Sequence, residues 1–298
     1  MKTNAKQILV IGSGTMGSGI AHTFAQHNYP VYLYDSNKEA LKLALEKITI
    51  NIDRQITKGS IHPADKEIVL KHIILCSDLT IAAKKCFLAI EAVPENVEIK
   101  KNVFEILDAH CPPETILASN TSSISITQIA GFTGRPDKVI GMHFMNPVPL
   151  MQLVEVISGL KTSDDTKKTV IDISKKIGKI PVTCSDSPGF VANRILMPMI
   201  NEAIYTLQEG VAGTLEIDQI MKLGMAHPMG PLQLADYIGL DVCLHIMEVL
   251  HAGFGNNKYA PCPLLVKMVH AGYLGQKNKK GFYDWSDPKN LIVNDIIR

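Results

Sequence analysis

The sequence has little of three features that mark common protein classes: aromatic residues, clustered cysteines and an excess of charge. One tryptophan and 6% aromatic residues occur in 298 residues, and the six cysteines include no Cys-x-x-Cys pair. Such scattered cysteines match neither zinc-ligand spacing nor a disulfide framework. Lys and Arg number 30 against 29 Asp and Glu, which argues against general affinity for nucleic-acid phosphates. We therefore predict free thiols, no metal ion and no nucleic-acid partner.

Long uncharged apolar segments are also missing from the sequence. Met1–Gln7 precede the first apolar run, Ile8–Ile11, and neither a signal-peptide core nor a membrane-length span follows. These features predict a cytoplasmic protein that has no membrane partner.

The chain does contain enough apolar residues for two packed domains, at 46% hydrophobic and 20% charged. In its first half, short β-branched runs alternate with amphipathic stretches, as in a parallel sheet with crossover helices. The predicted strands are 8–11, 31–34, 73–76, 87–91, 116–119, 139–143, 153–157 and 180–184. The predicted helices between them are 16–27, 39–58, 97–110, 126–130 and 166–177. We expect Asp164 or Asp165 to cap the last of these helices.

Strand signals stop after residue 184. Ser187-Pro188 looks like an N-cap followed by proline at the first helical position, which predicts a long helix to about Gln208. Further helices are predicted over 215–223, 231–250 and 263–271. The predicted fold class is therefore α/β, with a Rossmann-type doubly wound sheet in residues 1–185 and an all-helical domain in residues 186–298.

A glycine-rich turn, Gly12-x-Gly14-x-x-Gly17, directly follows the first predicted strand and opens the first predicted helix. In dinucleotide-binding folds these glycines make the tight turn, let the backbone approach a pyrophosphate, and let helix and strand pack closely. Asp35 ends the second predicted strand, where a carboxylate accepts hydrogen bonds from ribose hydroxyls and repels a 2′-phosphate. The sequence thus predicts binding of NAD rather than NADP, and the alternative is a purely structural turn.

His143 ends a predicted strand at the carboxyl edge of the sheet, where open α/β folds bind ligands. Glu155 alternates with Leu153 and Ile157 on the next strand, which predicts a buried carboxylate that needs a partner. If the chain reverses near Pro149, His143 and Glu155 are equidistant from the turn and face each other. Such a pair is either a general base for an alcohol proton or a structural ion pair.

Two more polar features are candidates for a site. The run 119–123, Ser-Asn-Thr-Ser-Ser, follows a predicted strand at the same edge, although such runs are usually ordinary loops or caps. Asn193 lies in an apolar helical stretch, where it either finds a partner or faces a cleft. Because Ser122 and Asn193 belong to different predicted domains, they predict a substrate site between the domains.

Together these segments resemble the L-3-hydroxyacyl-CoA dehydrogenase family, and within it the stand-alone 3-hydroxybutyryl-CoA dehydrogenases. The segments that carry the resemblance are 12–17, 119–123, 142–149, 153–156, 187–190, 230–232, 239–241 and 281–283. The resemblance implies that NAD takes a hydride from the carbon that bears the 3-hydroxyl of an acyl-CoA thioester, and that the protein is a homodimer.

The resemblance also implies roles for individual residues. His143 is the expected base, Glu155 its orienting partner, and Ser122 and Asn193 face the substrate. The residues expected near the cofactor are Gly12, Gly14, Thr15, Met16, Gly17, Asp35, Glu95, Lys100, Asn120, Asn146 and Lys277. For Lys277 a solvated charge is the alternative, because Asn278-Lys279 follow it where the family has a small residue and a glycine. Basic residues after the second strand either meet the CoA phosphates or form a solvated helix face: Lys42, Lys47, Arg54, Lys58 and Lys66.

Two other functions compete with this interpretation. A related hydroxy-acid dehydrogenase of the 3-hydroxyisobutyrate or 6-phosphogluconate type needs a catalytic lysine early in the long helix, and no lysine occurs from Thr183 to Met221. A crystallin-like structural relative that binds NAD without turnover would be expected to lack His143 or Glu155, and both are present. The sequence therefore favours the enzyme.

Overall fold

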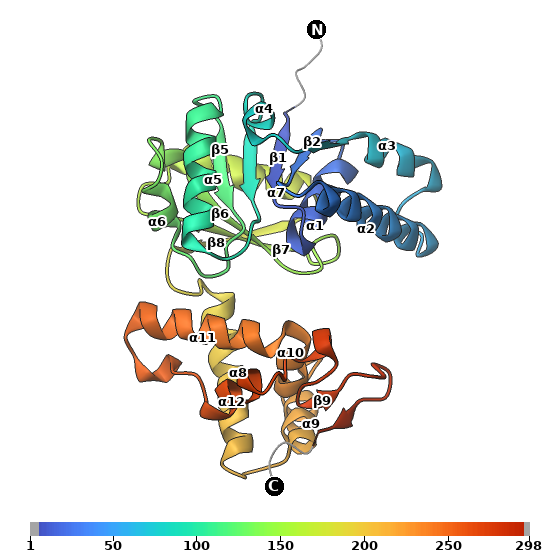
Figure 1. The fold of residues 1–298 in the computed structure, drawn as a ribbon, viewed down its shortest axis with the longest axis vertical. Coiled ribbons are helices and arrows are strands. Elements are labelled where there is room, and N and C mark those ends of the chain that lie inside the picture. Colours follow the sequence, from blue (N-terminus) through green and yellow to red (C-terminus); the bar gives the residue numbers. More distant parts are fainter. Residues whose placement is uncertain (1–5, 295–298) are drawn as a thin grey trace. The chain divides into compact units, whose positions relative to one another are not determined.

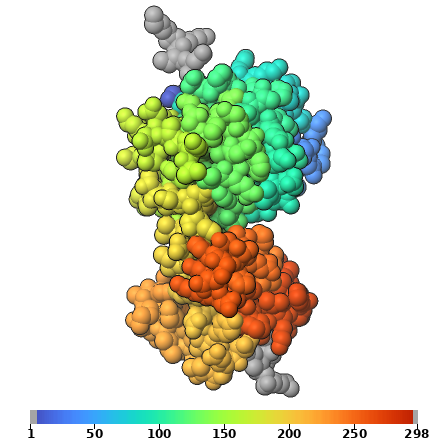
Figure 2. All heavy atoms as spheres, turned by 90° about the vertical axis from the view of Figure 1, so that its left-hand side faces the viewer, coloured from blue at the N-terminus to red at the C-terminus, as the bar shows by residue number. Residues whose placement is uncertain are grey.

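The structure is a computed structural model that describes residues 6–294. The chain divides into two units, Met1–Ser187 and Pro188–Arg298, and each is described by itself. Each unit has a hydrophobic core made of its own side chains. Figure 2 shows the heavy atoms of both units as spheres.

The first unit is built on an eight-stranded sheet in the order β3-β2-β1-β4-β5-β6-β7-β8 (Figure 1). The strands are β1 Ile8–Ile11, β2 Val31–Tyr34, β3 Ile73–Cys76, β4 Leu88–Glu91, β5 Ile116–Ser119, β6 Val139–Phe144, β7 Leu153–Ser158 and β8 Ile180–Ser185. Neighbouring strands are parallel except β6 and β7, which are antiparallel. Only residues 145–152 join those two strands, and a parallel crossover needs a dozen or more residues.

Helices connect the other strands of this sheet. They are α1 Thr15–Gln26, α2 Lys38–Thr57, α3 Lys66–Lys71, α4 Leu79–Ala83, α5 Val97–His110, α6 Ile126–Ala130 and α7 Asp164–Lys176, with short 3-10 turns at Pro63–Asp65 and Pro136–Lys138. The prediction that Asp164 or Asp165 caps α7 is wrong. The cap is Ser163, whose hydroxyl accepts the N–H of Thr166, and the two aspartates occupy the first turn, where the helix dipole favours them.

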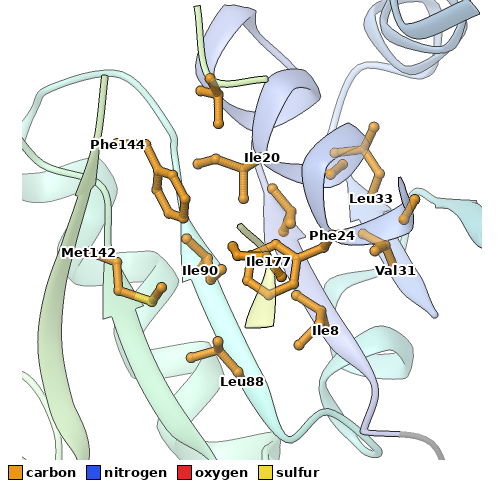
Figure 3. Packing of buried hydrophobic residues seen from close by; sticks show 14 of the residues in the cluster. Ile8, Ile20, Phe24, Val31, Leu33, Leu88, Ile90, Met142, Phe144 and Ile177 are labelled. Carbon is orange, nitrogen blue, oxygen red and sulfur yellow. The ribbon is translucent and has the colours of Figure 1, made fainter. Parts of the chain in front are cut away.

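The core of the first unit lies between the sheet and its helices. Figure 3 shows Ile20 and Phe24 of α1 packed onto side chains of β1, β2 and β4, beside Met142 and Phe144 of β6. Phe24 is completely buried and meets Tyr29 edge to face. This packing holds the start of α1 at the carboxyl end of β1, which places the glycine turn at the ligand-binding edge of the sheet.

The second unit is helical, as expected, with one small two-stranded ribbon added. Its elements are α8 Ala192–Gln208, α9 Thr214–Gly224, α10 Pro231–Ile238, α11 Leu240–Phe254, α12 Pro263–His270, 3-10 turns at Asn257–Tyr259 and Gln276–Asn278, and strands β9 Tyr283–Asp284 and β10 Ile292–Val293. Two carboxylates buried among these elements replace missing backbone partners. Asp218 accepts the N–H groups of Leu232 and Gln233 at the start of α10, and Asp236 accepts those of Phe282 and Tyr283.

Two helix predictions in this unit are wrong. Ser187-Pro188 does not open α8, because Gly189 and Phe190 have φ of +70° and +50°, so the helix begins only at Ala192. The predicted helix 231–250 is two helices, bent by 97° at Gly239, whose φ is +107°. No single helix within residues 6–294 is long and apolar enough to cross a membrane; α10 and α11 pass that test only when joined across the bend.

Buried His22 makes the stability of this fold depend on pH in the acid range. Its side chain on α1 is completely buried, and burial lowers its pKa to about 4, against a smaller opposing effect of Gln55. Between pH 6.5 and 4 the unfolded chain therefore binds a proton at His22 that the folded chain does not, so stability falls as the pH falls through this range. Lowering the pKa of His22 from 6.5 to about 4 corresponds to a loss of about 3 kcal/mol in the free energy of unfolding once both states are fully titrated.

We expect His22→Leu to lose less stability than the parent between pH 6.5 and 4, as measured by urea unfolding at a series of pH values. His110→Leu, at an exposed position on α5, is the matched control and should follow the parent. Parallel curves for His22→Leu and the parent would show that His22 does not govern this range.

Candidate active site

The glycine turn between β1 and α1 leaves no room for side chains at two of its glycines. A Cβ on Gly12, whose φ is +98°, would lie 2.6 Å from the carbonyl oxygen of Ala92, and one on Gly17 would lie 1.8 Å from that of Gly12. Gly14 instead has nothing within 4 Å of its Cβ position and is the N-cap of α1, with no side-chain cap. First-turn N–H groups without a side-chain cap are donors for an anion such as a pyrophosphate.

Asp35 follows β2 and is tied to this turn. One carboxylate oxygen accepts the N–H and the hydroxyl of Ser13, both at 2.8 Å, and the other accepts the N–H of Asn37 at 2.9 Å. Burial raises its pKa, but these hydrogen bonds outweigh burial and hold the pKa below its ordinary value. Asp35 is thus ionised at neutral pH, with acceptor capacity left for ribose hydroxyls. The open first turn and this carboxylate fit a dinucleotide.

His143 and Glu155 face each other across β6 and β7. The strand register pairs the two residues directly, as the spacing about Pro149 predicts, and Nδ1 of His143 lies 2.7 Å from Oε2 of Glu155. Both are largely buried, at 9% and 4% exposed. When Nδ1–H donates to the carboxylate, Nε2 becomes the basic nitrogen of the neutral ring. The geometry can therefore move a proton at Nε2.

The run 119–123 is held by a buried network of carboxylates and one ammonium. Glu91, at the end of β4, is 0% exposed and accepts hydrogen bonds from Lys100 Nζ at 2.6 Å and the Ser119 hydroxyl at 2.6 Å. Lys100 also pairs with Glu95 at 3.1 Å. Burial raises the pKa of Glu91, and the ammonium of Lys100 acts in the opposite direction by favouring the ionised carboxylate.

Glu95 in turn shapes the loop that carries Ser122. Its Oε1 accepts the backbone N–H groups of Ser122 and Ser123, both at 3.0 Å, and the hydroxyls of Thr121 and Ser123. Burial opposes ionisation, but Lys100 and these hydrogen bonds together lower the pKa of Glu95. Glu95 and Lys100, both expected near the cofactor, thus lie together and set the conformation of the Ser122 loop.

Asn120 and Asn146 follow the neighbouring strands β5 and β6 at the carboxyl edge of the sheet. The side-chain oxygen of Asn120 accepts the N–H of Phe144, the residue after His143, at 2.9 Å. Asn146 lines a pocket of about 310 Å³ together with Thr15, at the start of α1, and with Lys47 and Arg54 of α2. Met16 is half-buried on α1 and packs against the core.

The remaining predicted residues lie in the second unit. Asn193 is in the first turn of α8 and is 9% exposed. Lys277 lies in the 3-10 turn Gln276–Asn278, where its ammonium pairs with Asp241. Within residues 6–294, no cluster of three or more His, Cys, Asp or Glu side chains is placed to hold a metal ion.

Glu91 is the residue of this edge that the sequence did not single out. The available signal was a carboxylate at the end of an otherwise apolar run, Leu88-Ala89-Ile90-Glu91, at the same sheet edge as His143. Its partner Lys100 is nine positions away on a helix, so no short motif joins the two residues.

Comparisons with known proteins find relatives that match both units of the chain. Residues 7–187 match the family model for the NAD-binding domain of 3-hydroxyacyl-CoA dehydrogenase, and residues 189–285 match its C-terminal domain. The chain is 54% identical to a probable 3-hydroxybutyryl-CoA dehydrogenase of Bacillus subtilis over 95% of this chain and 98% of that protein. It is also 54% identical to the 3-hydroxybutyryl-CoA dehydrogenase of Clostridioides difficile, over 94% and 99%.

A solved structure shows the same similarity. The crystal structure of (S)-3-hydroxybutyryl-CoA dehydrogenase from Ralstonia eutropha superposes with a TM-score of 0.91 at 46% identity, and covers 95% of this chain and all of that one. The two domain matches, the 54% identity over nearly the whole chain, and the glycine turn with Asp35 lead to one conclusion. The chain belongs to the 3-hydroxyacyl-CoA dehydrogenase family, with an NAD-binding domain at residues 7–187.

Proposed function

We propose that this protein interconverts (S)-3-hydroxybutyryl-CoA and acetoacetyl-CoA with NAD as its cofactor. The observation that carries the proposal is the 2.7 Å contact between His143 Nδ1 and Glu155 Oε2 at the carboxyl edge of the NAD-binding sheet. The relatives named as 3-hydroxybutyryl-CoA dehydrogenases support the short acyl chain.

His143 and Glu155 supply the proton chemistry of the proposed reaction. The glycine turn and Asp35 would hold NAD, which would supply the acceptor for the hydride on the carbon that carries the hydroxyl. His143 Nε2 removes the hydroxyl proton in oxidation and returns a proton to the ketone oxygen in reduction. Glu155 holds the ring in the tautomer that leaves Nε2 basic, and its negative charge stabilises the imidazolium that forms.

Ser122 and Asn193 are proposed to face the thioester. The Ser122 loop is preorganised for this role, because Glu95 accepts the N–H groups of two successive residues, Ser122 and Ser123. Asn193 lies in the first turn of α8 and is 9% exposed. Preorganised polar groups orient a substrate without further loss of entropy.

The pocket between α2 and the loop 145–152 supports recognition of the CoA phosphates. Lys47 and Arg54 line one side of it, and Asn146 to Pro149 line the other. A lysine and an arginine about two turns apart on the same face of a helix suit a diphosphate or phosphate group, which arginine binds in bidentate geometry. Five basic residues after β2 are candidates for the CoA phosphates: Lys42, Lys47, Arg54, Lys58 and Lys66. Lys47 and Arg54 are the two that line this pocket.

The enzymatic proposal is tested by assaying the purified protein with acetoacetyl-CoA and either NADH or NADPH. We expect rapid turnover with NADH and much slower turnover with NADPH, because ionised Asp35 repels a 2′-phosphate. Asp35→Asn should reduce the difference in turnover between NADH and NADPH, whereas Asp165→Asn, in the exposed first turn of α7, should leave that difference unchanged.

Two results would contradict the assignment. Equal turnover of the parent with NADH and NADPH would remove the role given to Asp35. Absence of turnover with both cofactors, in a protein that still binds NADH, would favour the alternative of an NAD-binding structural relative.

We further propose that the protein acts as a homodimer in the cytoplasm. Large apolar side chains are exposed on α8, α9 and the segments that follow them, including Ile195 at 67%, Ile220 at 60% and Leu223 at 85%. Such exposure is typical of a surface that a second copy covers. All six cysteines are free thiols, as is usual in reducing compartments.

A further inference from the structure

The proposed reaction does not account for Lys179, a buried lysine just before β8. It is 7% exposed, and its Nζ donates hydrogen bonds to the backbone carbonyls of Val148 at 2.5 Å and Met151 at 2.8 Å. Among residues 6–294 no carboxylate oxygen lies within 4.0 Å of this ammonium. Burial of an ammonium is costly and lowers its pKa, so its two carbonyl partners are the compensation that the structure provides.

Both carbonyls belong to the loop 145–152, which is also held at two other points. The N–H of Ile180 donates to the carbonyl of Gln152 at 2.8 Å, next to the Lys179 contacts. On the other side Val148 is 2% exposed and packs on α1, where a Cβ added to Gly19 would lie 2.9 Å from the Val148 Cβ. The loop is therefore clamped between the start of β8 and α1.

This clamp fixes one wall of the pocket described above. Residues 146–149 line the pocket opposite Lys47 and Arg54, and the first carbonyl that Lys179 holds is in that wall. We propose that Lys179 is a positioning residue for recognition of the CoA nucleotide: its ammonium sets the distance between this wall and the basic side chains of α2. The inference rests on the proposed function, because it takes a CoA thioester as the occupant of the pocket.

The test separates the nucleotide end of the substrate from its reacting end. Lys179→Met keeps most of the length of the side chain and removes the charge, and Lys175→Met, on the exposed face of α7, is the matched control. Turnover of acetoacetyl-CoA is compared with that of acetoacetyl-N-acetylcysteamine, which has the reacting thioester but no nucleotide. We expect Lys179→Met to raise KM for acetoacetyl-CoA by about 10- to 100-fold, and to leave KM and kcat for the truncated thioester at parent values.

Two further measurements keep the proposal testable if Lys179→Met folds poorly. Gly19→Ala pushes on the same loop from the α1 side, since its Cβ would lie too close to Val148, and should show the same selective rise in KM. Hydrogen exchange of the cofactor-free protein should show faster exchange of the amides in 145–152 in both variants, and no change in Lys175→Met.

A loss of kcat shared by both thioesters would overturn the proposal, since it would mean that Lys179 acts on the catalytic pair or on the whole fold. An unchanged KM for acetoacetyl-CoA in a folded Lys179→Met variant would also overturn it. Failure of the proposed function itself is distinct, because the parent would then turn over neither thioester, while hydrogen exchange would still report on the clamp.

Discussion

Replacement of His143 by glutamine is expected to lower the maximal rate of acetoacetyl-CoA reduction by about 100- to 10,000-fold, the range that general acid–base groups contribute. Glutamine can still donate a hydrogen bond to Glu155, but it cannot exchange a proton with the substrate oxygen. Binding of NADH, followed by fluorescence, should stay near the parent value because the role proposed for His143 is on the substrate. His110→Gln, at an exposed position on α5, is the control for loss of a histidine.

Glu155→Gln tests the second member of the same pair. The substitution keeps the shape of the side chain and removes the negative charge 2.7 Å from Nδ1 of His143. The rate should fall, because the negative charge that stabilises the imidazolium formed in the proposed reaction is gone. Equal rates for Glu155→Gln and the parent would mean that the contact is structural and that His143 works without it.

The other large effect is expected on stability, from Lys100→Met. This change leaves Glu91, which is 0% exposed, without the cation that lies 2.6 Å from it. Removal of one partner from a buried ion pair costs about 3–5 kcal/mol because the remaining charge is left in an apolar environment. Urea unfolding of the variant and the parent at neutral pH measures the difference directly.

The pH dependence of this loss follows from the pKa of Glu91. Burial already raises that pKa, and removal of Lys100 raises it further, so folded Glu91 holds a proton over a pH range in which the unfolded chain does not. Stability of Lys100→Met should therefore fall as the pH rises through that range. The double variant Glu91→Gln/Lys100→Met has no unpaired charge at position 91, and Glu95, which loses the same cation, keeps its hydrogen bonds from the Ser122 loop, so the double variant should recover part of the loss. A double variant as unstable as the single one would assign the effect to packing.

Local patterns were sufficient to predict most elements of the first unit. Apolar runs such as Ile8–Ile11 and Val31–Tyr34 form strands at the predicted positions because both faces of a parallel sheet are buried. The glycine turn was also predictable, since its steric demands involve neighbours in one strand–turn–helix unit. The His143–Glu155 pairing could be predicted because a short loop makes the strands antiparallel, and equal spacing about the turn then sets the register.

Helix boundaries were less predictable where the backbone takes an unusual conformation. The apolar periodicity of 231–250 continues through Gly239, but a φ of +107° there bends the chain by 97°. Likewise, proline at 188 favours a helix start, and the left-handed φ values of the next two residues prevent it. At Gly189 and Gly239 the deciding factor is a positive φ that glycine permits but does not require, and at Phe190 it is a left-handed φ that is uncommon for a residue with a side chain.

The sequence by itself therefore determined the sheet, the nucleotide-binding turn and the His143–Glu155 pairing, since each depends on residues close in the chain or symmetric about one turn. Only the tertiary structure decided which charges are buried. Lys100 and Lys179 look in the sequence like other lysines, yet one lies between Glu91 and Glu95 and the other between two backbone carbonyls. Burial of a charge depends on the packing of elements distant in sequence, and the partners that make it tolerable come from those same elements.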